Sequence, residues 1–153
     1  KYISSDIQYF SFLRPINEVQ IASLFAKNKE YYKVFKSCNV GSKTDSWCGK
    51  CPKCLFTYLI MSPFIPEKDL IEIYGRNLLK DNDLLPILKQ LKGEVEVKPF
   101  ECVGTIEEVN ACLAVSSQQS AVSISDLLNQ YDEMNNLPEH FEAILKDNLF
   151  KNN

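Results

Sequence analysis

The sequence has little of what most self-contained active sites are built from. It holds five glycines and one histidine among 153 residues, and it contains no Gly-x-x-x-x-Gly-Lys-Ser/Thr, Gly-x-Gly-x-x-Gly or Ser-Gly-Gly loop of the kinds that hold phosphate groups. No histidine is paired with a nucleophile, and no carboxylate cluster is spaced for metal chelation. We therefore expect the chain to take part in chemistry only by completing a site on a neighbouring domain.

Long hydrophobic runs are also missing. The longest, residues 111–115, is far shorter than the roughly 18 residues of a membrane span, so we expect no membrane partner. The first residues lack the basic and apolar regions of a signal peptide, and the chain begins at Lys1 and not at a methionine. From these features we expect part of a longer, cytoplasmic protein. A composition of 45% hydrophobic and 24% charged residues is typical of a globular domain with a core.

Positive charge is concentrated in one segment. Residues 27–53 contain seven lysines against Glu30 and Asp45, a balance of +5, whereas residues 54–153 carry −8; residues 1–26 cancel, which gives the net charge of −3. A lysine-rich segment can attract phosphate or nucleic acid, but a solvated surface is the simpler interpretation. The pI near 5.2 disfavours a nucleic-acid partner.

Hydrophobic periodicity and capping residues predict a mainly α protein. Asp83 is a candidate cap for one helix, Thr105 and Glu108 form a candidate capping box for another, and Ser125 or Asp126 is a candidate cap for a third. The predicted helices cover residues 15–26, 52–61, 66–73, 84–91, 105–116, 125–131 and 138–150.

A Ser/Gln-rich stretch suggests a division of the chain. We expect a zinc-bearing helical domain over residues 1–115, a linker over 116–123, and C-terminal helices over 124–153. The expected fold is thus a small helical domain with a four-cysteine zinc knuckle.

Four of the six cysteines are the strongest chemical signal. Cys38, Cys48, Cys51 and Cys54 follow the pattern C-x9-C-x2-C-x2-C, and four thiolates can complete a tetrahedral shell around zinc. Reduced structural thiols, disulfides and an iron–sulfur cluster are the alternatives, and the absence of a signal peptide disfavours disulfides. Because all four ligands would come from the protein, we expect structural zinc. The isolated Cys112 is expected to be buried, while Cys102, between a charged pair and a glycine, could serve as a thiolate.

Three local strings, taken in order, carry a family resemblance. Residues 12–18 (FLRPINE), 47–54 (WCGKCPKC) and 98–104 (KPFECVG) together resemble the C-terminal part of the UDP-N-acetylmuramoyl-L-alanyl-L-glutamate epimerases of peptidoglycan synthesis. The likeness extends over about residues 5–115. It implies that this chain is the C-terminal fragment of a larger α/β protein whose upstream domain, of the ATP-pyrophosphatase-like superfamily, binds ATP and Mg²⁺.

The resemblance also implies a reaction and residue roles. The family inverts the terminal L-glutamate of a UDP-linked muramoyl dipeptide after ATP activates its carboxylate, and a fragment without the ATP loop should be inactive. Arg14, Glu18 and Lys98 would contact the substrate, and Glu101 and Cys102 would act in proton transfer. For Glu18 the alternative is charge compensation at a helix start. For residues 98–104 it is a tight loop that packs Phe100 into the core.

Two other functions remain open. The cysteine string also resembles the zinc tail of the 7-cyano-7-deazaguanine synthases, an interpretation that aromatic stacking residues such as Trp47 or Phe56 beside the knuckle would favour. Alternatively, the chain is a non-catalytic zinc-binding interaction module, which the basic segment 27–53 would favour.

Overall fold

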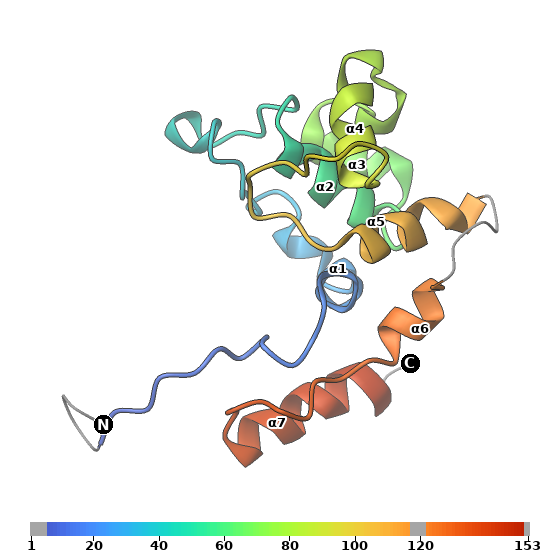
Figure 1. Cartoon of the computed structure of the whole chain (residues 1–153). Helices are drawn as coiled ribbons and strands as arrows, with labels where there is room; N and C mark the ends of the chain where they lie inside the picture. The colour runs from blue at the N-terminus through green and yellow to red at the C-terminus, as the bar shows by residue number, and fades with distance from the viewer. Residues whose placement is uncertain (1–5, 117–121, 152–153) are drawn as a thin grey trace.

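The computed structural model describes residues 6–116 and 122–151, and within these ranges the protein is helical and contains no β-strand. Short 3₁₀ turns and, after the last helix, a π-helical turn at Asp147–Lys151 complete the structure. Figure 1 shows the seven α-helices, which are α1 (Glu18–Ala26), α2 (Pro52–Met61), α3 (Glu67–Tyr74), α4 (Leu85–Leu91), α5 (Ile106–Leu113), α6 (Ile124–Leu128) and α7 (Glu139–Lys146).

Helix α2 is the centre of the main core. Every residue from Cys54 to Met61 is buried, because α1, α3, α4 and α5 all pack against this helix. Pro52 lies in the first turn, where its missing N–H is not needed, and Cys51 is the N-cap. The string of three cysteines therefore leads directly into the central helix of the main core.

Helix α1 is fixed at its start by two polar side chains. Asn17 and Gln20 form a reciprocal capping box, and Gln20, which is fully buried, donates to the carbonyl oxygens of Leu128 and Gln130 at 3.0 and 2.7 Å. The Asn17 amide donates to the carbonyl of Leu127 at 2.8 Å. Because a buried amide must be satisfied, these bonds hold the start of α1 against the end of α6.

The N-terminal segment and α7 run side by side below the helices of the main core (Figure 1). Phe10 stacks on Phe141 with ring centroids 5.1 Å apart, and the Asp132 N–H donates to the Pro15 carbonyl at 2.9 Å. A second, smaller core forms here around Leu137, Leu145 and Leu149.

The expected linker lies mostly outside the described ranges, which exclude residues 117–121. After this stretch, α6 packs on α1 and α5, and Leu127 belongs to the main core. The division into residues 1–115, 116–123 and 124–153 stays a prediction.

Two predicted helix caps are wrong by a few residues. Asp81 and not Asp83 caps the chain before α4, because a 3₁₀ turn at Asn82–Leu84 precedes that helix. Ser123 caps α6 in a capping box whose other member is Asp126. The predicted box of Thr105 and Glu108 at α5 is confirmed.

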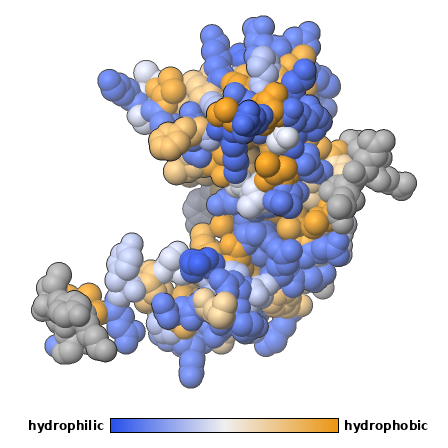
Figure 2. Space-filling model, viewed as in Figure 1, coloured by the Kyte–Doolittle hydropathy of each residue, from blue (hydrophilic) through white to orange (hydrophobic). Residues whose placement is uncertain are grey.

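The described helices are all too short or too polar to cross a lipid bilayer. On the face drawn in Figure 2, polar side chains dominate and hydrophobic ones are scattered over the upper body. The same view shows a hollow between the helices of the main core and the part below them, which contains the N-terminal segment and α7.

Candidate functional site

The four clustered cysteines form a candidate metal centre. The sulfur atoms of Cys38, Cys48, Cys51 and Cys54 all lie within 4.8 Å of one another, and three of their separations are 3.4, 3.6 and 3.9 Å. A tetrahedral ion with metal–sulfur bonds of about 2.3 Å would place its ligands about 3.8 Å apart. These separations are far longer than the roughly 2.05 Å of a disulfide. The structure thus brings the four cysteines together in a cluster that could hold a metal ion, and their role as zinc ligands stays a prediction.

The backbone around the cysteines also supports a thiolate site. The Gly41 N–H points at the Cys38 sulfur at 3.2 Å, and the Lys50 N–H points at the Cys48 sulfur at 3.4 Å. Gly49 adopts a φ of 65°, which allows the sharp turn between the second and third ligands. Arg76 donates to the Gly49 carbonyl at 2.9 Å. Such contacts orient the sulfurs before a metal binds.

Burial opposes negative charge on two of these thiols. Burial raises the pKa of Cys51 to about 11 and raises the pKa of Cys54 further, because a thiolate loses hydration there. A cation at the centre of the cluster would reverse this preference, since the metal binds the thiolate form. With four protein ligands and no open position, the bound ion would be structural.

Aromatic rings beside the knuckle belong to the core. The Trp47 indole donates to the Phe35 carbonyl at 3.1 Å, and its ring lies 4.7 Å from that of Tyr74. Phe56 is only 3% exposed. Packing in the core therefore accounts for both residues, and neither supports a stacking platform for a purine base.

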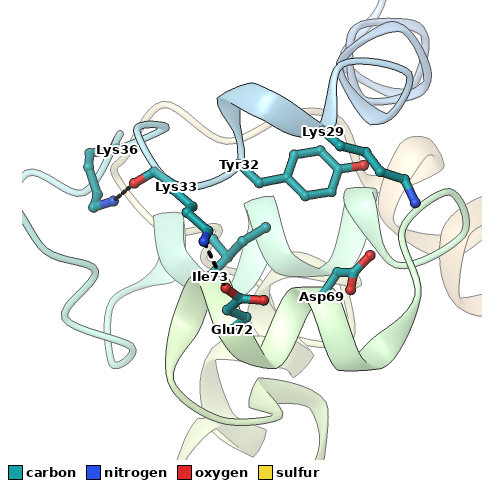
Figure 3. A pocket seen from close by; sticks show the side chains of 7 residues that line it. All are labelled: Lys29, Tyr32, Lys33, Lys36, Asp69, Glu72 and Ile73. Atoms are coloured by element: carbon teal, nitrogen blue, oxygen red, sulfur yellow. Dashed lines mark hydrogen bonds and ion pairs between the residues drawn. The ribbon is translucent and has the colours of Figure 1, made fainter.

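Part of the basic segment faces acidic groups. A hollow of about 390 Å³ lies between the segment containing Lys29, Lys33 and Lys36 and α3, and Figure 3 shows the side chains that line it. The Lys33 ammonium lies 3.6 Å from a Glu72 carboxylate oxygen, and Asp69 lines the same hollow. The local positive charge is thus partly balanced across the hollow, which favours the interpretation of a solvated surface.

A second concave site brings two of the predicted substrate residues together. A groove of about 560 Å³ runs between the start of α1, the loop of residues 98–104 and the start of α5. Glu18 and Lys98 both line it, together with Gly104, Glu107 and Glu108. Two strings that lie far apart in the sequence therefore meet at one groove.

Glu108 holds the walls of this groove together. Its side chain is 3% exposed; one carboxylate oxygen accepts the Glu18 N–H at 2.7 Å, and the other accepts the Thr105 N–H at 2.6 Å. One carboxylate thus satisfies N–H groups at the starts of two helices. A Cβ added to Gly104 would lie 2.5 Å from this carboxylate and 2.6 Å from the Phe56 ring, so the close approach requires glycine.

The groove carries two charges without opposite partners. Within residues 6–116 and 122–151, neither the Glu18 carboxylate nor the Lys98 ammonium takes part in an ion pair with an opposite charge. The Lys98 ammonium donates to the Gly104 carbonyl. Partial burial, reinforced by the Glu108 carboxylate and opposed by Lys53, raises the pKa of Glu18 above its usual value.

The other predicted site residues, Arg14, Glu101 and Cys102, are not among those that line this groove. Arg14 lines an adjacent hollow and pairs with Asp132 at 3.6 Å. The Glu101 carboxylate accepts the Lys53 N–H at 3.2 Å, at the start of α2. Cys102 is exposed on the same loop, and Phe100 is fully exposed, so the alternative that this loop packs Phe100 into the core is wrong.

Sequence reasoning identified Glu108 only as part of a capping box. The contact with Glu18, 90 residues away, has no local sequence signal. The sequence signal that could have drawn attention to it is a glycine, Gly104, directly before a capping box whose third position is acidic.

Comparison with known proteins gives the family. The profile described as the MurL C-terminal domain matches residues 34–147. A protein named UDP-N-acetyl-alpha-D-muramoyl-L-alanyl-L-glutamate epimerase from Micromonospora is 42% identical over 115 residues, which is 72% of this chain and 26% of that protein. The protein of the same name from Xanthomonas oryzae is 38% identical over 126 residues, 78% of this chain and 28% of its own length.

A third relative of the same name, from Salinispora tropica, is 41% identical over 116 residues, 73% of this chain and 25% of that protein. The chain thus spans about a quarter of the length of these curated relatives. No solved structure matches it significantly. Since the family profile covers most of the sequence, this chain belongs to the MurL C-terminal domain family.

Proposed function

We propose that this chain is the C-terminal domain of an ATP-dependent epimerase that inverts the terminal L-glutamate of UDP-N-acetylmuramoyl-L-alanyl-L-glutamate for peptidoglycan synthesis in the cytoplasm. The match to relatives named as this epimerase carries the proposal. The chain alone is inactive in this scheme. An upstream α/β domain of the same protein binds ATP and Mg²⁺, and this domain completes the substrate site.

The chemistry explains why ATP is needed. The α-proton beside a free carboxylate is very weakly acidic, because its loss would place two negative charges next to each other. Converting that carboxylate to an acyl adenylate removes one charge and withdraws electrons from the α-carbon. Proton removal from one face and return to the other then inverts the centre, and hydrolysis releases the product.

Residues of this domain have defined parts in the proposal. Lys98 and Glu18 contact the anionic substrate in the groove, which both residues line, and Arg14 contacts it from the adjacent hollow. Glu101 and Cys102 take part in proton transfer. Each role is a proposal that substitution in the full-length enzyme can test.

The metal in this proposal is zinc, held by the four clustered cysteines. Four thiolates with sulfur separations of 3.4–3.9 Å match the ligand type and size that zinc prefers. Zinc acts here as a structural ion. It fixes the start of α2, whose Lys53 N–H holds Glu101, so the metal supports the loop that carries Lys98.

The test compares the full-length protein with the same protein truncated to remove this domain, and with the domain alone. Only the full-length protein should convert the L-glutamate dipeptide when ATP is present. If the truncated protein is equally active, this domain does not complete the site. Salt-sensitive binding of RNA by an isolated domain, together with full activity of the truncated enzyme, would favour the non-catalytic interaction module instead.

A further inference from the structure

We propose that the Glu18 carboxylate is itself a proton-transfer group, which takes the α-proton of the substrate's terminal glutamate while the Lys98 ammonium binds a carboxylate of that same glutamate. This inference rests on the proposed epimerase function. It assigns Glu18 a catalytic role and not merely a binding one.

The two groups lie at one concave site. Glu18 and Lys98 line the same groove of about 560 Å³, a volume in the range of small-molecule sites. The Lys98 ammonium uses one of its three donors on the Gly104 carbonyl, which leaves two for a ligand. When its α-carboxylate is activated, the terminal glutamate keeps an anionic side-chain carboxylate for Lys98, and its α-carbon, two methylene groups away, is the atom that Glu18 deprotonates.

In the described parts of the chain, Glu18 and Glu107 are the groove glutamates whose carboxylates form no hydrogen bond or ion pair, and Glu18 is the one whose backbone is held by Glu108. The Glu108 carboxylate accepts two backbone N–H groups, and the Glu101 carboxylate accepts the Lys53 N–H. In the described parts of the chain, the Glu18 backbone N–H is bound to Glu108 while its side chain forms no hydrogen bond or ion pair. The carboxylate is therefore held at the groove by a fixed backbone and remains free to accept a proton.

The surroundings of Glu18 suit a general base. The groups that face it are Glu108 and Glu107 from α5, Lys98 from the loop and Lys53 from α2. Burial and the Glu108 charge raise its pKa, against the effect of Lys53. A carboxylate with a raised pKa binds a proton more strongly, which makes it a better base at neutral pH.

The proton-transfer step conserves atoms and electrons. The Cα–H bond breaks, an O–H bond forms on Glu18, and the electron pair moves onto the carbonyl oxygen of the activated acyl group. In this scheme the Cys102 thiol, which has a part in proton transfer under the proposed function, then gives its proton to the opposite face: its S–H bond breaks, the electron pair returns from the oxygen to the α-carbon, the new Cα–H bond forms, and a thiolate remains. The nucleotide-activated carboxylate is supplied by the reaction of the proposed function, so the step needs no oxidant or reductant.

The experiment follows exchange of the α-proton in the full-length enzyme. The L-glutamate dipeptide is incubated with ATP in D₂O, deuterium at the α-carbon is measured by NMR, and ATP consumption is measured in parallel. Glu18→Gln keeps the size of the side chain but cannot act as a base. We expect it to slow exchange by at least about 100-fold, while substrate-dependent ATP consumption and the KM stay within about threefold of wild type.

A control substitution removes a charge nearby without touching the groove. Glu96 is exposed two residues before Lys98, and Glu96→Gln should exchange at the wild-type rate. If the wild type exchanges and Glu18→Gln exchanges equally fast, Glu18 is not the base, and the proposed function stands. If Glu18→Gln loses ATP consumption in proportion to exchange, the residue has a binding role and the inference is overturned. If the wild type shows no exchange, the proposed function fails.

Discussion

Loss of one cysteine ligand should unfold the metal-binding part of the domain. Cys54 is fully buried at the start of the central helix α2, and its sulfur lies 3.6 Å from Cys48 and 3.4 Å from Cys51. Structural zinc supplies about 10–16 kcal/mol of apparent binding free energy in small zinc domains. This equals or exceeds the whole stability of a typical domain, about 5–15 kcal/mol. Cys54→Ser should therefore abolish both metal binding and cooperative folding.

The assay combines metal analysis by mass spectrometry with thermal melting followed by circular dichroism. Wild-type protein should carry about one zinc per chain and should lose its melting transition when a chelator removes the metal. Cys102→Ser is the matched control, because that thiol is exposed and lies outside the cluster; it should keep both the metal and the wild-type transition. A folded wild type with almost no metal, or a Cys54→Ser variant that melts like wild type, would refute the reasoning.

Three further predictions concern the groove, and denaturant unfolding of the metal-loaded domain measures each. Gly104→Ala should destabilise by about 1–3 kcal/mol, because the new Cβ would meet the Phe56 ring at 2.6 Å; an unchanged midpoint would contradict this. Glu108→Ala should cost about 2–4 kcal/mol, since two backbone N–H groups lose their acceptor, whereas the exposed neighbour Glu107→Ala should cost under about 0.5 kcal/mol. Glu18→Gln should stabilise by a few tenths of a kcal/mol at neutral pH, because the raised pKa of Glu18 means that its ionised form costs stability. That gain should disappear as the pH falls below the unfolded value of about 4.3; a gain that grows on acidification would show that the sign is wrong.

The sequence predicted those features whose causes are local. Helix α2 has its predicted bounds, since Pro52 starts it and Ser62-Pro63 follows. The cysteine cluster was predictable for a similar reason, because three of its four cysteines lie within seven residues of sequence. The predicted cap at Asp83 failed because a 3₁₀ turn places the capping residue two positions earlier, at Asp81.

The groove could not be predicted in the same way. The likeness to the epimerases singled out Glu18 and Lys98 separately, but their meeting depends on Glu108, whose carboxylate contacts the start of α1 across 90 residues of sequence. The capping box at Thr105 was predicted from the sequence, whereas the one at Asn17 was not, although both depend only on local residues. That one carboxylate serves both helix starts is a tertiary property, and only the structure contains it.

The central claim is that this domain completes an enzyme that inverts L-glutamate. The most direct measurement incubates the full-length protein with UDP-N-acetylmuramoyl-L-alanyl-L-glutamate, with and without ATP and Mg²⁺. The terminal amino acid is then released by acid hydrolysis and separated by chiral chromatography. We predict that D-glutamate accumulates only when ATP is present and not with the isolated domain. Recovery of L-glutamate alone from the folded, zinc-loaded full-length protein, with ATP supplied, would contradict the account.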